Sequence, residues 1–242
     1  NNEIGVIQPV SEIAEVLSGS DVFLHCDASQ ALGKIELELK SAGVDLASFS
    51  AHKAYGPQGV GALYAGARAR SVLSAIDFGG GQEKGLRPGT VPVALCAGFG
   101  TACELAVEGL SEERSRLSSL REIFLSRIAR LNPLLHGHSD PAWNVPGILS
   151  VRFAGIDSET LLMALPMVAM STGSACSSSS VDDRSEQLSH VIEAVSGSPE
   201  ASRETVRLSF GRFTSMSEVE LAAEAFVRAV EEIREIQGEV RG

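Results

Sequence analysis

The sequence lacks the features that mark nucleic-acid-binding and membrane proteins. Its 242 residues contain 20 Lys and Arg against 31 Asp and Glu, which gives a formal net charge of -11. An acidic chain does not offer the positive surface that attracts nucleic acids and anionic membranes. No apolar run approaches the roughly 20 residues of a membrane span, and no basic segment followed by an apolar stretch opens the chain. We therefore expect a cytoplasmic globular protein that binds neither nucleic acid nor membrane.

Cysteine is scarce and does not occur in metal-binding spacings. The four cysteines are Cys26, Cys96, Cys103 and Cys176, and none of them forms the C-x-x-C pair of a structural zinc site or a dithiol redox motif. We therefore predict no metal site and consider each cysteine separately. Cys96 and Cys103 lie in one Ala-rich stretch at helical spacing, which predicts two buried structural cysteines on one helix face.

Short apolar runs and turn signals alternate over the first part of the chain. Apolar runs at 22–27, 44–50 and 60–64 predict strands, and Pro9 suits the first turn of a short helix. Runs that end in functional groups are typical of buried, mostly parallel strands with a site at their carboxyl ends. A long helix is predicted over 91–110, so residues 1–110 indicate an α/β domain.

Residues 111–242 have the pattern of a small α+β domain. A helix from Ser111 should bury one stripe, formed by Leu117, Leu120, Phe124, Ile128 and Leu131. Alternating runs at 148–153 and 205–210 predict half-buried strands, with Arg207 pointing away from the core. Ser217 and Glu220 predict a capping box for the last helix, which should bury Val219, Ala223, Phe226, Val230 and Ile233.

Lys53 is the first candidate for chemistry. It follows a predicted strand in the segment Ser50-Ala51-His52-Lys53 and precedes a tight turn. An amine there can form a Schiff base with a carbonyl cofactor, and partial desolvation beside other cations makes it more nucleophilic. Lysine is usually exposed, so the residue by itself also fits a solvated surface position.

Asp27 ends the strand predicted over 22–27. A buried carboxylate at this place needs a cationic partner, and the protonated ring nitrogen of a pyridine cofactor is one such partner. The alternative is a carboxylate that caps the following helix. The residue alone leaves both interpretations open.

The combination of these segments is specific. His25-x-Asp27-Ala28-Ser29-Gln30, followed by Ser50-Ala51-His52-Lys53, resembles the fold-type I pyridoxal-phosphate enzymes, and within them the class V aminotransferase group. Asn1-Asn2-Glu3-Ile4-Gly5 and the glycine-rich stretch from Gly79 to Thr90 are similar to the same group. The segment Ser171-Thr172-Gly173-Ser174-Ala175-Cys176 is similar to the S-x-G-S-A-C loop of cysteine desulfurases, which other members of the group do not need.

The resemblance implies a fold and a cofactor. Residues 1–110 would be the C-terminal portion of the large domain, a mostly parallel sheet with helices that binds pyridoxal 5'-phosphate. Residues 111–242 would be the small α+β domain, which carries the cysteine loop. The family has a long segment before this region, so we expect the chain to be the C-terminal part of a longer enzyme. A homodimer is also implied.

The resemblance implies a cofactor contact for each matching residue. Lys53 would bind the cofactor covalently and then move protons, while Asp27 would keep the ring nitrogen protonated. The remaining contacts would be Asn2 and Gln30 to the ring oxygen, Ser50 and His52 to the phosphate, and Thr90 to the phosphate of the neighbouring subunit.

The resemblance further implies how the substrate L-cysteine is used. Arg207, together with Asn2, would bind the substrate carboxylate, for which a guanidinium offers a bidentate fork. The thiolate of Cys176 would attack the substrate sulfur, leaving a persulfide on the protein and releasing alanine. A sulfur acceptor, such as an iron-sulfur scaffold protein, would then take the sulfur. A buried structural cysteine is the alternative, but buried cysteines rarely lie in so polar a tract.

Three hypotheses follow for the chain. The first is a cysteine desulfurase, which the loop around Cys176 favours. The second is another class V enzyme, such as a selenocysteine lyase or an aminotransferase. The third is a catalytically incomplete fragment, and binding of the cofactor would distinguish it from the other two.

Overall fold

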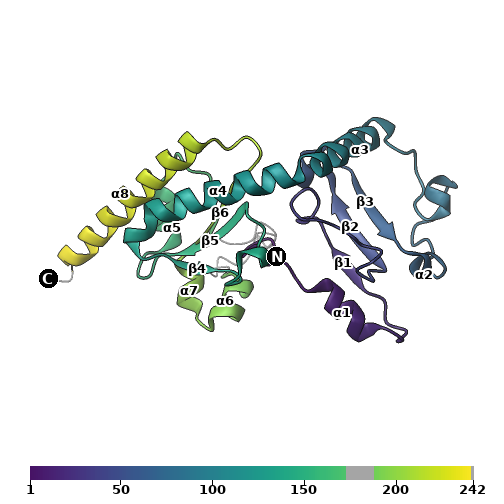
Figure 1. Cartoon of the computed structure of the whole chain (residues 1–242), viewed down its shortest axis with the longest axis horizontal. Helices are drawn as coiled ribbons and strands as arrows, with labels where there is room; N and C mark the ends of the chain where they lie inside the picture. Colours follow the sequence, from purple (N-terminus) through teal and green to yellow (C-terminus); the bar gives the residue numbers. More distant parts are fainter. Residues whose placement is uncertain (173–187, 241–242) are drawn as a thin grey trace. The chain divides into compact units, whose positions relative to one another are not determined.

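The computed structural model describes residues 1–172 and 188–240 (Figure 1). The chain divides into two compact units. The amino-terminal unit is Gln8–Ser111, and the carboxy-terminal unit combines Asn1–Ile7 with Glu112–Gly242. The domain assignment from sequence, 1–110 and 111–242, stays a prediction.

The amino-terminal unit is built on a three-stranded sheet of order β1-β2-β3. β1 pairs with β2 in parallel, with Asp27 opposite Ser48, whereas β2 and β3 are antiparallel. The antiparallel pair follows from the short connection, since a parallel crossover needs a dozen or more residues. The elements of this unit are α1 (Val10–Leu17), β1 (His25–Asp27), β2 (Leu46–Ser50), the 3₁₀ helix η1 (Ala51–Ala54), β3 (Gly61–Ala65), α2 (Ala67–Arg70), η2 (Gln82–Gly85) and α3 (Val93–Glu108).

The strands of this sheet are less buried than the sequence predicts. β1 and β3 are largely exposed, and Leu63 on β3 is 55% exposed. The reason is that the buried cluster beside the sheet is small, centred on Ala28, Val44 and Ala47.

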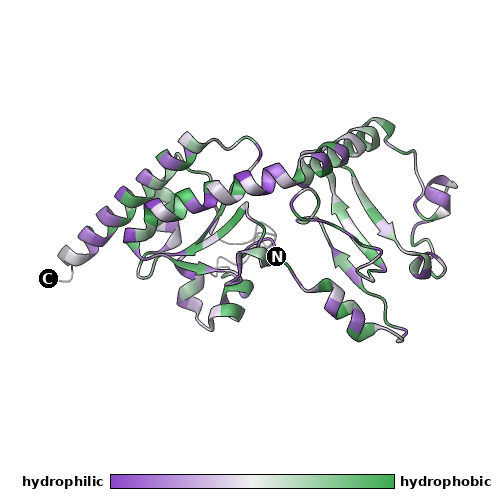
Figure 2. Cartoon of the chain, viewed as in Figure 1, coloured by the Kyte–Doolittle hydropathy of each residue, from purple (hydrophilic) through white to green (hydrophobic). Residues whose placement is uncertain are grey.

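Along α3, which Figure 2 shows as predominantly apolar, Cys96 is exposed, so the prediction of a buried cysteine is wrong there.

Arg68 ties α2 to the segments that precede β1 and β2. Its guanidinium donates to both carboxylate oxygens of Asp45, at 2.9 and 2.8 Å, and to the Val22 carbonyl. It also lies 4.4 Å from the centroid of the Phe23 ring. The hydrogen bonds from Arg68 lower the pKa of Asp45 to about 2, so this carboxylate is ionised at every pH above that value.

The Asp45 carboxylate is expected to make the stability of this unit depend on acid. A carboxyl group whose pKa is lower in the folded protein stabilises the fold above its unfolded pKa, and this contribution is lost as the pH falls towards about 2. We expect Asp45→Asn to melt at a lower temperature than the wild type at pH 5, with the difference shrinking between pH 4 and pH 2. Thermal circular dichroism across this range measures the difference. A difference that stays constant with pH would contradict the assignment.

The carboxy-terminal unit is an antiparallel sheet of order β4-β5-β6 covered by helices, the α+β arrangement predicted from the sequence. β5 is the central strand and is buried from Ile148 to Val151, so the prediction of a half-buried strand is wrong. The elements are α4 (Leu110–Ile128), η3 (Ala129–Leu131), β4 (Leu134–His136), η4 (Pro141–Trp143), β5 (Ile148–Arg152), α5 (Ser158–Ala164), α6 (His190–Ser196), α7 (Pro199–Arg203), β6 (Thr205–Ser209) and α8 (Met216–Val240).

The core of this unit forms between the sheet and the helices α4 and α8. The apolar stripe predicted on the helix from Ser111 is confirmed. Its residues lie on α4 and η3 and are all buried: Leu117, Leu120, Phe124, Ile128 and Leu131. Phe226 of α8 packs edge-on against Phe124 at a centroid distance of 5.5 Å and stacks on Phe153 at 5.9 Å. Figure 2 shows the corresponding mixture of apolar and polar residues along α8.

The last helix is capped by a different pair of residues from the one predicted. The capping box is formed by Ser215 and Glu218, because Ser215 N donates to Glu218 Oε2 at 2.8 Å and Glu218 N donates to Ser215 Oγ at 3.3 Å. The prediction of Ser217 and Glu220 is therefore wrong by two positions. Glu220 instead pairs with Arg127 of α4 at 2.5 Å.

The first seven residues are tied to the carboxy-terminal unit by polar contacts. Glu3 is only 4% exposed, and its carboxylate accepts a hydrogen bond from the Ser189 hydroxyl at the start of α6. Val6 pairs with Asn144 as an isolated antiparallel bridge. The start of the chain, including Asn2, therefore belongs to the carboxy-terminal unit.

Within residues 1–172 and 188–240, no single helix is long and apolar enough to cross a membrane. In the same described part of the chain, the bent pair of helices 93–108 and 110–131 is long and apolar enough when the two helices are counted together.

Candidate active site

The amino-terminal unit gathers five predicted site residues at one edge of its sheet. β1 and β2 are parallel, so their carboxyl ends meet at the same edge. Asp27 is the last residue of β1 and Ser50 the last of β2, while His52 and Lys53 lie on η1, directly after β2. Gln30 lies in the turn that follows β1.

The turn after β2 has a constrained backbone. Tyr55 ends η1 in the left-handed region with φ 62°, which is uncommon for a residue other than glycine. A Cβ atom on Gly61, opposite Ser50, would lie 2.5 Å from the Phe49 carbonyl oxygen, so only glycine fits there. These constraints fix the direction in which the chain leaves the sheet at Lys53.

Asp27 is exposed, which differs from the buried carboxylate considered in the first interpretation and agrees with the capping alternative. Its Oδ1 atom accepts a hydrogen bond from Ser29 N at 2.9 Å. Hydrogen bonds from the Ser29 side chain and backbone lower the pKa of Asp27. The carboxylate thus caps the following turn, and it remains ionised at neutral pH, as a partner of a pyridinium nitrogen must be.

Lys53 and His52 are exposed, and neither makes a hydrogen bond or ion pair to another residue that the structure describes.

A second lysine, Lys34, is close enough for its charge to interact with that of Lys53. Lys34 is half-buried, and its ammonium donates a hydrogen bond of 2.5 Å to Gln30 Oε1. Burial and the charge of Lys53 lower the pKa of Lys34 to about 8. Sequence reasoning missed Lys34, although its spacing from Gln30 was a usable signal.

These side chains fit pyridoxal phosphate. The sheet edge offers an accessible amine at Lys53 and an ionised carboxylate at Asp27. Ser50, at the end of β2, and His52 add a hydroxyl and an imidazole, which are suitable donors to a phosphate. An amine, an anion and phosphate donors are the groups that this cofactor requires of a protein.

The carboxy-terminal unit gathers a second group of predicted residues around Arg207. Its guanidinium Nη1 donates to the Asn2 carbonyl oxygen at 3.0 Å. The backbone of Arg207 forms an antiparallel bridge with Ser171, with N–H to carbonyl distances of 2.8 and 3.1 Å. Ser171 is the first residue of the segment that contains Cys176. Cys176 itself lies outside the described residues.

Thr90 is exposed and lies between η2 and α3. In the same loop, Gln82 Oε1 accepts a hydrogen bond from Gly89 N at 3.2 Å, and Glu83 and Lys84 have positive φ angles. The role of Thr90 towards a neighbouring subunit stays a prediction.

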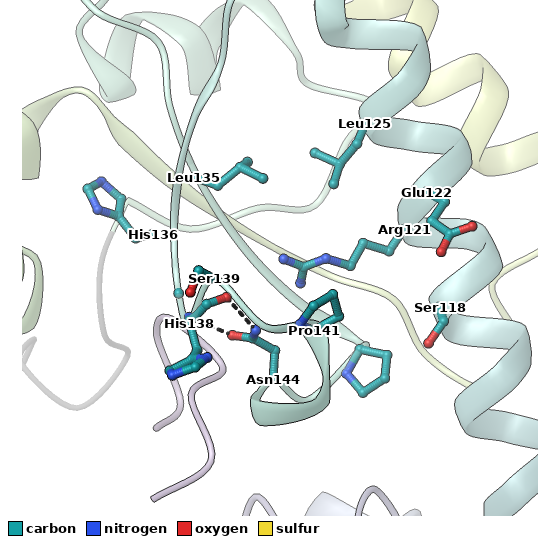
Figure 3. A pocket seen from close by; sticks show the side chains of 12 residues that line it. Ser118, Arg121, Glu122, Leu125, Leu135, His136, His138, Ser139, Pro141 and Asn144 are labelled. Atoms are coloured by element: carbon teal, nitrogen blue, oxygen red, sulfur yellow. Dashed lines mark hydrogen bonds between the residues drawn. The ribbon is translucent and has the colours of Figure 1, made fainter.

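The carboxy-terminal unit also has a pocket of about 470 Å³ that contains none of the predicted site residues (Figure 3). Figure 3 shows the Arg121 side chain reaching into it from α4, and Arg121 Nη1 donates to the Ile148 carbonyl at 2.8 Å. Burial lowers the pKa of Arg121. On the opposite wall, the buried Asn144 side chain bonds to the backbone N–H and carbonyl of His138, at 3.0 and 2.8 Å.

A family model described as aminotransferase class-V matches residues 1–221. The chain belongs to this family. Enzymes of the aminotransferase class-V family depend on pyridoxal phosphate, so the cofactor predicted from the sequence is confirmed for the family. The matched residues include parts of both units and all the site residues at the edge of the first sheet.

Curated relatives in the class-V family carry the name cysteine desulfurase. The chain is 42% identical to the cysteine desulfurase of Mus musculus over 236 residues, which are 98% of this chain and 50% of the relative. It is 40% identical to the cysteine desulfurase IscS of Pseudomonas putida strain W619, over 98% of this chain and 57% of the relative. The chain thus spans about half the length of the curated relatives it matches.

Solved structures of class-V relatives have the same fold. A NifS-like protein is 31% identical, with a TM-score of 0.82 over 96% of this chain and 59% of the other. The NifS-like protein from Rickettsia africae is 26% identical, also with a TM-score of 0.82, over 96% of this chain and 60% of the other. These similarities confirm the predicted fold, which is that of the fold-type I pyridoxal-phosphate enzymes.

Proposed function

We propose that this protein is a cysteine desulfurase, which removes sulfur from L-cysteine with the help of pyridoxal phosphate. The observation that carries the proposal is the sheet edge that brings Asp27 and Lys53 together at the carboxyl ends of two parallel strands. Relatives named cysteine desulfurase, at about 40% identity, and the segment around Cys176 support this activity over others in the family.

The residues of the amino-terminal unit would hold the cofactor, whose ring withdraws electrons from the substrate carbon when it is bound. The Asp27 carboxylate would bind the ring N–H, and Gln30 would donate to the ring oxygen. Ser50 and His52 would donate to the phosphate. The Lys53 amine would bind the cofactor carbonyl carbon and, after substrate has taken its place, carry protons to and from the substrate carbons.

The residues of the carboxy-terminal unit would hold the substrate and receive its sulfur. The Arg207 guanidinium and Asn2 would bind the L-cysteine carboxylate. The Cys176 thiolate would attack the substrate sulfur, so that a sulfur–sulfur bond forms and the carbon–sulfur bond breaks. The carbon takes up a proton and leaves as alanine, while Cys176 keeps the sulfur as a persulfide. L-Cysteine and one thiol thus give alanine and one persulfide, with no external oxidant.

Cys176→Ala is expected to abolish sulfide release while the protein still binds the cofactor. Without the thiolate, nothing accepts the sulfur, so we expect the rate of alanine formation to fall by at least about a hundredfold. The assay combines the protein with pyridoxal phosphate, L-cysteine and a reductant, and it measures sulfide, alanine and visible absorbance. Cys96→Ala, which removes an exposed cysteine of α3, is the matched control and should behave as the wild type.

Other outcomes of the same assay would identify the alternatives. Cofactor binding without sulfide release, combined with turnover of selenocysteine or transfer of an amino group, would favour another class-V enzyme. Failure of the wild type to bind the cofactor would overturn the desulfurase proposal for this chain.

Three further parts of the proposal are supported by sequence alone. A homodimer, in which Thr90 reaches the phosphate of the neighbouring subunit, is supported by the glycine-rich segment from Gly79 to Thr90. Transfer of the persulfide sulfur to an iron-sulfur scaffold or another acceptor is supported by the segment around Cys176. A cytoplasmic location is proposed because no apolar run in the sequence approaches the roughly 20 residues of a membrane span.

A further inference from the structure

We propose that Lys34 is a positioning residue, whose ammonium fixes the Gln30 amide so that its N–H groups face the cofactor ring oxygen. This inference rests on the proposed function, because Gln30 acts on the cofactor only if the cofactor is bound. Lys34 takes part in none of the reaction steps proposed above, so its role would be to orient another side chain.

The hydrogen bond between Lys34 and Gln30 determines the orientation of the amide. Lys34 Nζ lies 2.5 Å from Gln30 Oε1. An ammonium only donates hydrogen bonds, so the atom that faces it must be the amide oxygen. The Nε2 atom of Gln30 therefore points away from Lys34 with both of its hydrogens. It makes no hydrogen bond to another residue that the structure describes, so these donors are available to a ligand at the sheet edge.

The position of Lys34 also explains why this contact is strong. The side chain is half-buried rather than extended into water, and a hydrogen bond from a desolvated ion is about twice as strong as one between neutral groups. The turn after β1 provides the geometry, because Ala31 N and Leu32 N both donate to the Ala28 carbonyl and Lys34 N donates to the Ala31 carbonyl. Lys34 and Gln30 thus come to lie on the same side of a helical turn.

The charge of Lys34 acts on the same site. Its interaction with Lys53 contributes to lowering the pKa of Lys34 to about 8, so the two amines lie in one electrostatic environment. The Lys34 ammonium polarises the Gln30 amide. Its positive charge also favours negative charge on the cofactor ring oxygen, which would accept a hydrogen bond from the Gln30 amide. Loss of Lys34 should therefore alter both the affinity for the cofactor and the pH at which its absorbance changes.

The test compares Lys34→Met with the wild type and with Lys40→Met, which removes the same charge from an exposed position. We expect Lys34→Met to raise the dissociation constant of pyridoxal phosphate about tenfold, the size of one hydrogen bond to a charged group. The pH midpoint of the visible absorbance of the bound cofactor should rise by roughly half a unit or more, because a nearby positive charge is gone. In Lys34→Arg the pH midpoint should lie closer to the wild-type value than in Lys34→Met, since arginine keeps the positive charge.

A double-mutant cycle shows whether Lys34 acts through Gln30. In a Gln30→Ala background, Lys34→Met should change the dissociation constant less than twofold, because the amide that it positions is absent. Full additivity of the two effects, or an unchanged absorbance midpoint in Lys34→Met, would overturn the positioning role.

A titration without cofactor separates this inference from the proposed function. Carbon-13 NMR of the Lys34 side chain should give a pKa near 8, and Lys53→Met should raise it by removing a neighbouring charge. An ordinary lysine pKa would overturn the inference even if the wild type binds the cofactor. If the wild type binds no cofactor, the proposed function fails and the role of Lys34 towards the cofactor fails with it, whatever the titration shows about the contact.

Discussion

Lys53→Ala is expected to remove the visible absorbance of the bound cofactor and to lower the rate of alanine formation by at least about a hundredfold, the smaller end of the range for general acid–base catalysis. The exposed Lys53 amine can bind the cofactor carbonyl and also carry a proton, whereas the Lys34 ammonium is half-buried and donates to Gln30. Both functions are lost with the side chain, so the effect should exceed that of any other single replacement in the amino-terminal unit.

The structure makes this experiment easy to interpret. Lys53 is exposed, and it makes no hydrogen bond or ion pair to another described residue. Its removal should therefore leave the melting temperature within about a degree of the wild type, since surface substitutions rarely change stability by more than about 0.5 kcal/mol. Lys53→Arg keeps a positive charge without a nucleophilic amine, and it should be as inactive as Lys53→Ala. Substantial activity in Lys53→Arg would mean that charge, rather than covalent chemistry, is the function of this residue.

Phe226→Ala is expected to destabilise the carboxy-terminal unit by about 3–5 kcal/mol, the usual range for removing a buried phenylalanine. Phe226 is completely buried and contacts the rings of Phe124 and Phe153. Its removal leaves a cavity beside Phe124 of α4 and Phe153, the residue that follows β5. The loss also includes the aromatic contacts, worth about 0.5–1.5 kcal/mol each.

Fluorescence measures this effect in one unit alone. The chain has one tryptophan, Trp143, and it lies in the carboxy-terminal unit. Urea unfolding followed by tryptophan emission therefore reports the unit that contains Phe226. Leu221→Ala is the matched control, because Leu221 lies on the same helix but is 65% exposed, and its replacement should cost no more than about 0.5 kcal/mol. Equal losses in the two variants would mean that the core between α4, α8 and the sheet is not the main source of stability.

The sequence predicted apolar strands that end at Asp27 and Ser50, and the structure forms both of them. Residues such as Asp27 and Lys53 follow directly after apolar strands, and parallel pairing then brings the strand ends together. Their local environments could not be predicted. Asp27 is exposed and caps the turn by accepting from Ser29 N, and the contact of Lys34 with Gln30 depends on the exact path of the turn after β1.

The misplaced helix cap shows another limit of pattern reasoning. Both Ser215 with Glu218 and Ser217 with Glu220 match the capping-box spacing. The choice is made by a distant side chain, Arg116 of α4, which donates to the carbonyls of Gly211 and Thr214 at 2.7 Å and fixes the turn before the helix. The spacing of serine and glutamate alone does not contain that information.

The hydrogen bond between Arg207 and the Asn2 carbonyl has a consequence for the entropy of ligand binding. A free arginine side chain has about 2 kcal/mol of rotamer entropy to lose when it becomes ordered. In this protein, part of that freedom is already lost in the folded state, because the guanidinium is held by a backbone carbonyl before any ligand arrives. A carboxylate that binds Arg207 therefore meets a guanidinium whose direction is set, and more of the charge-assisted hydrogen bonding appears as affinity.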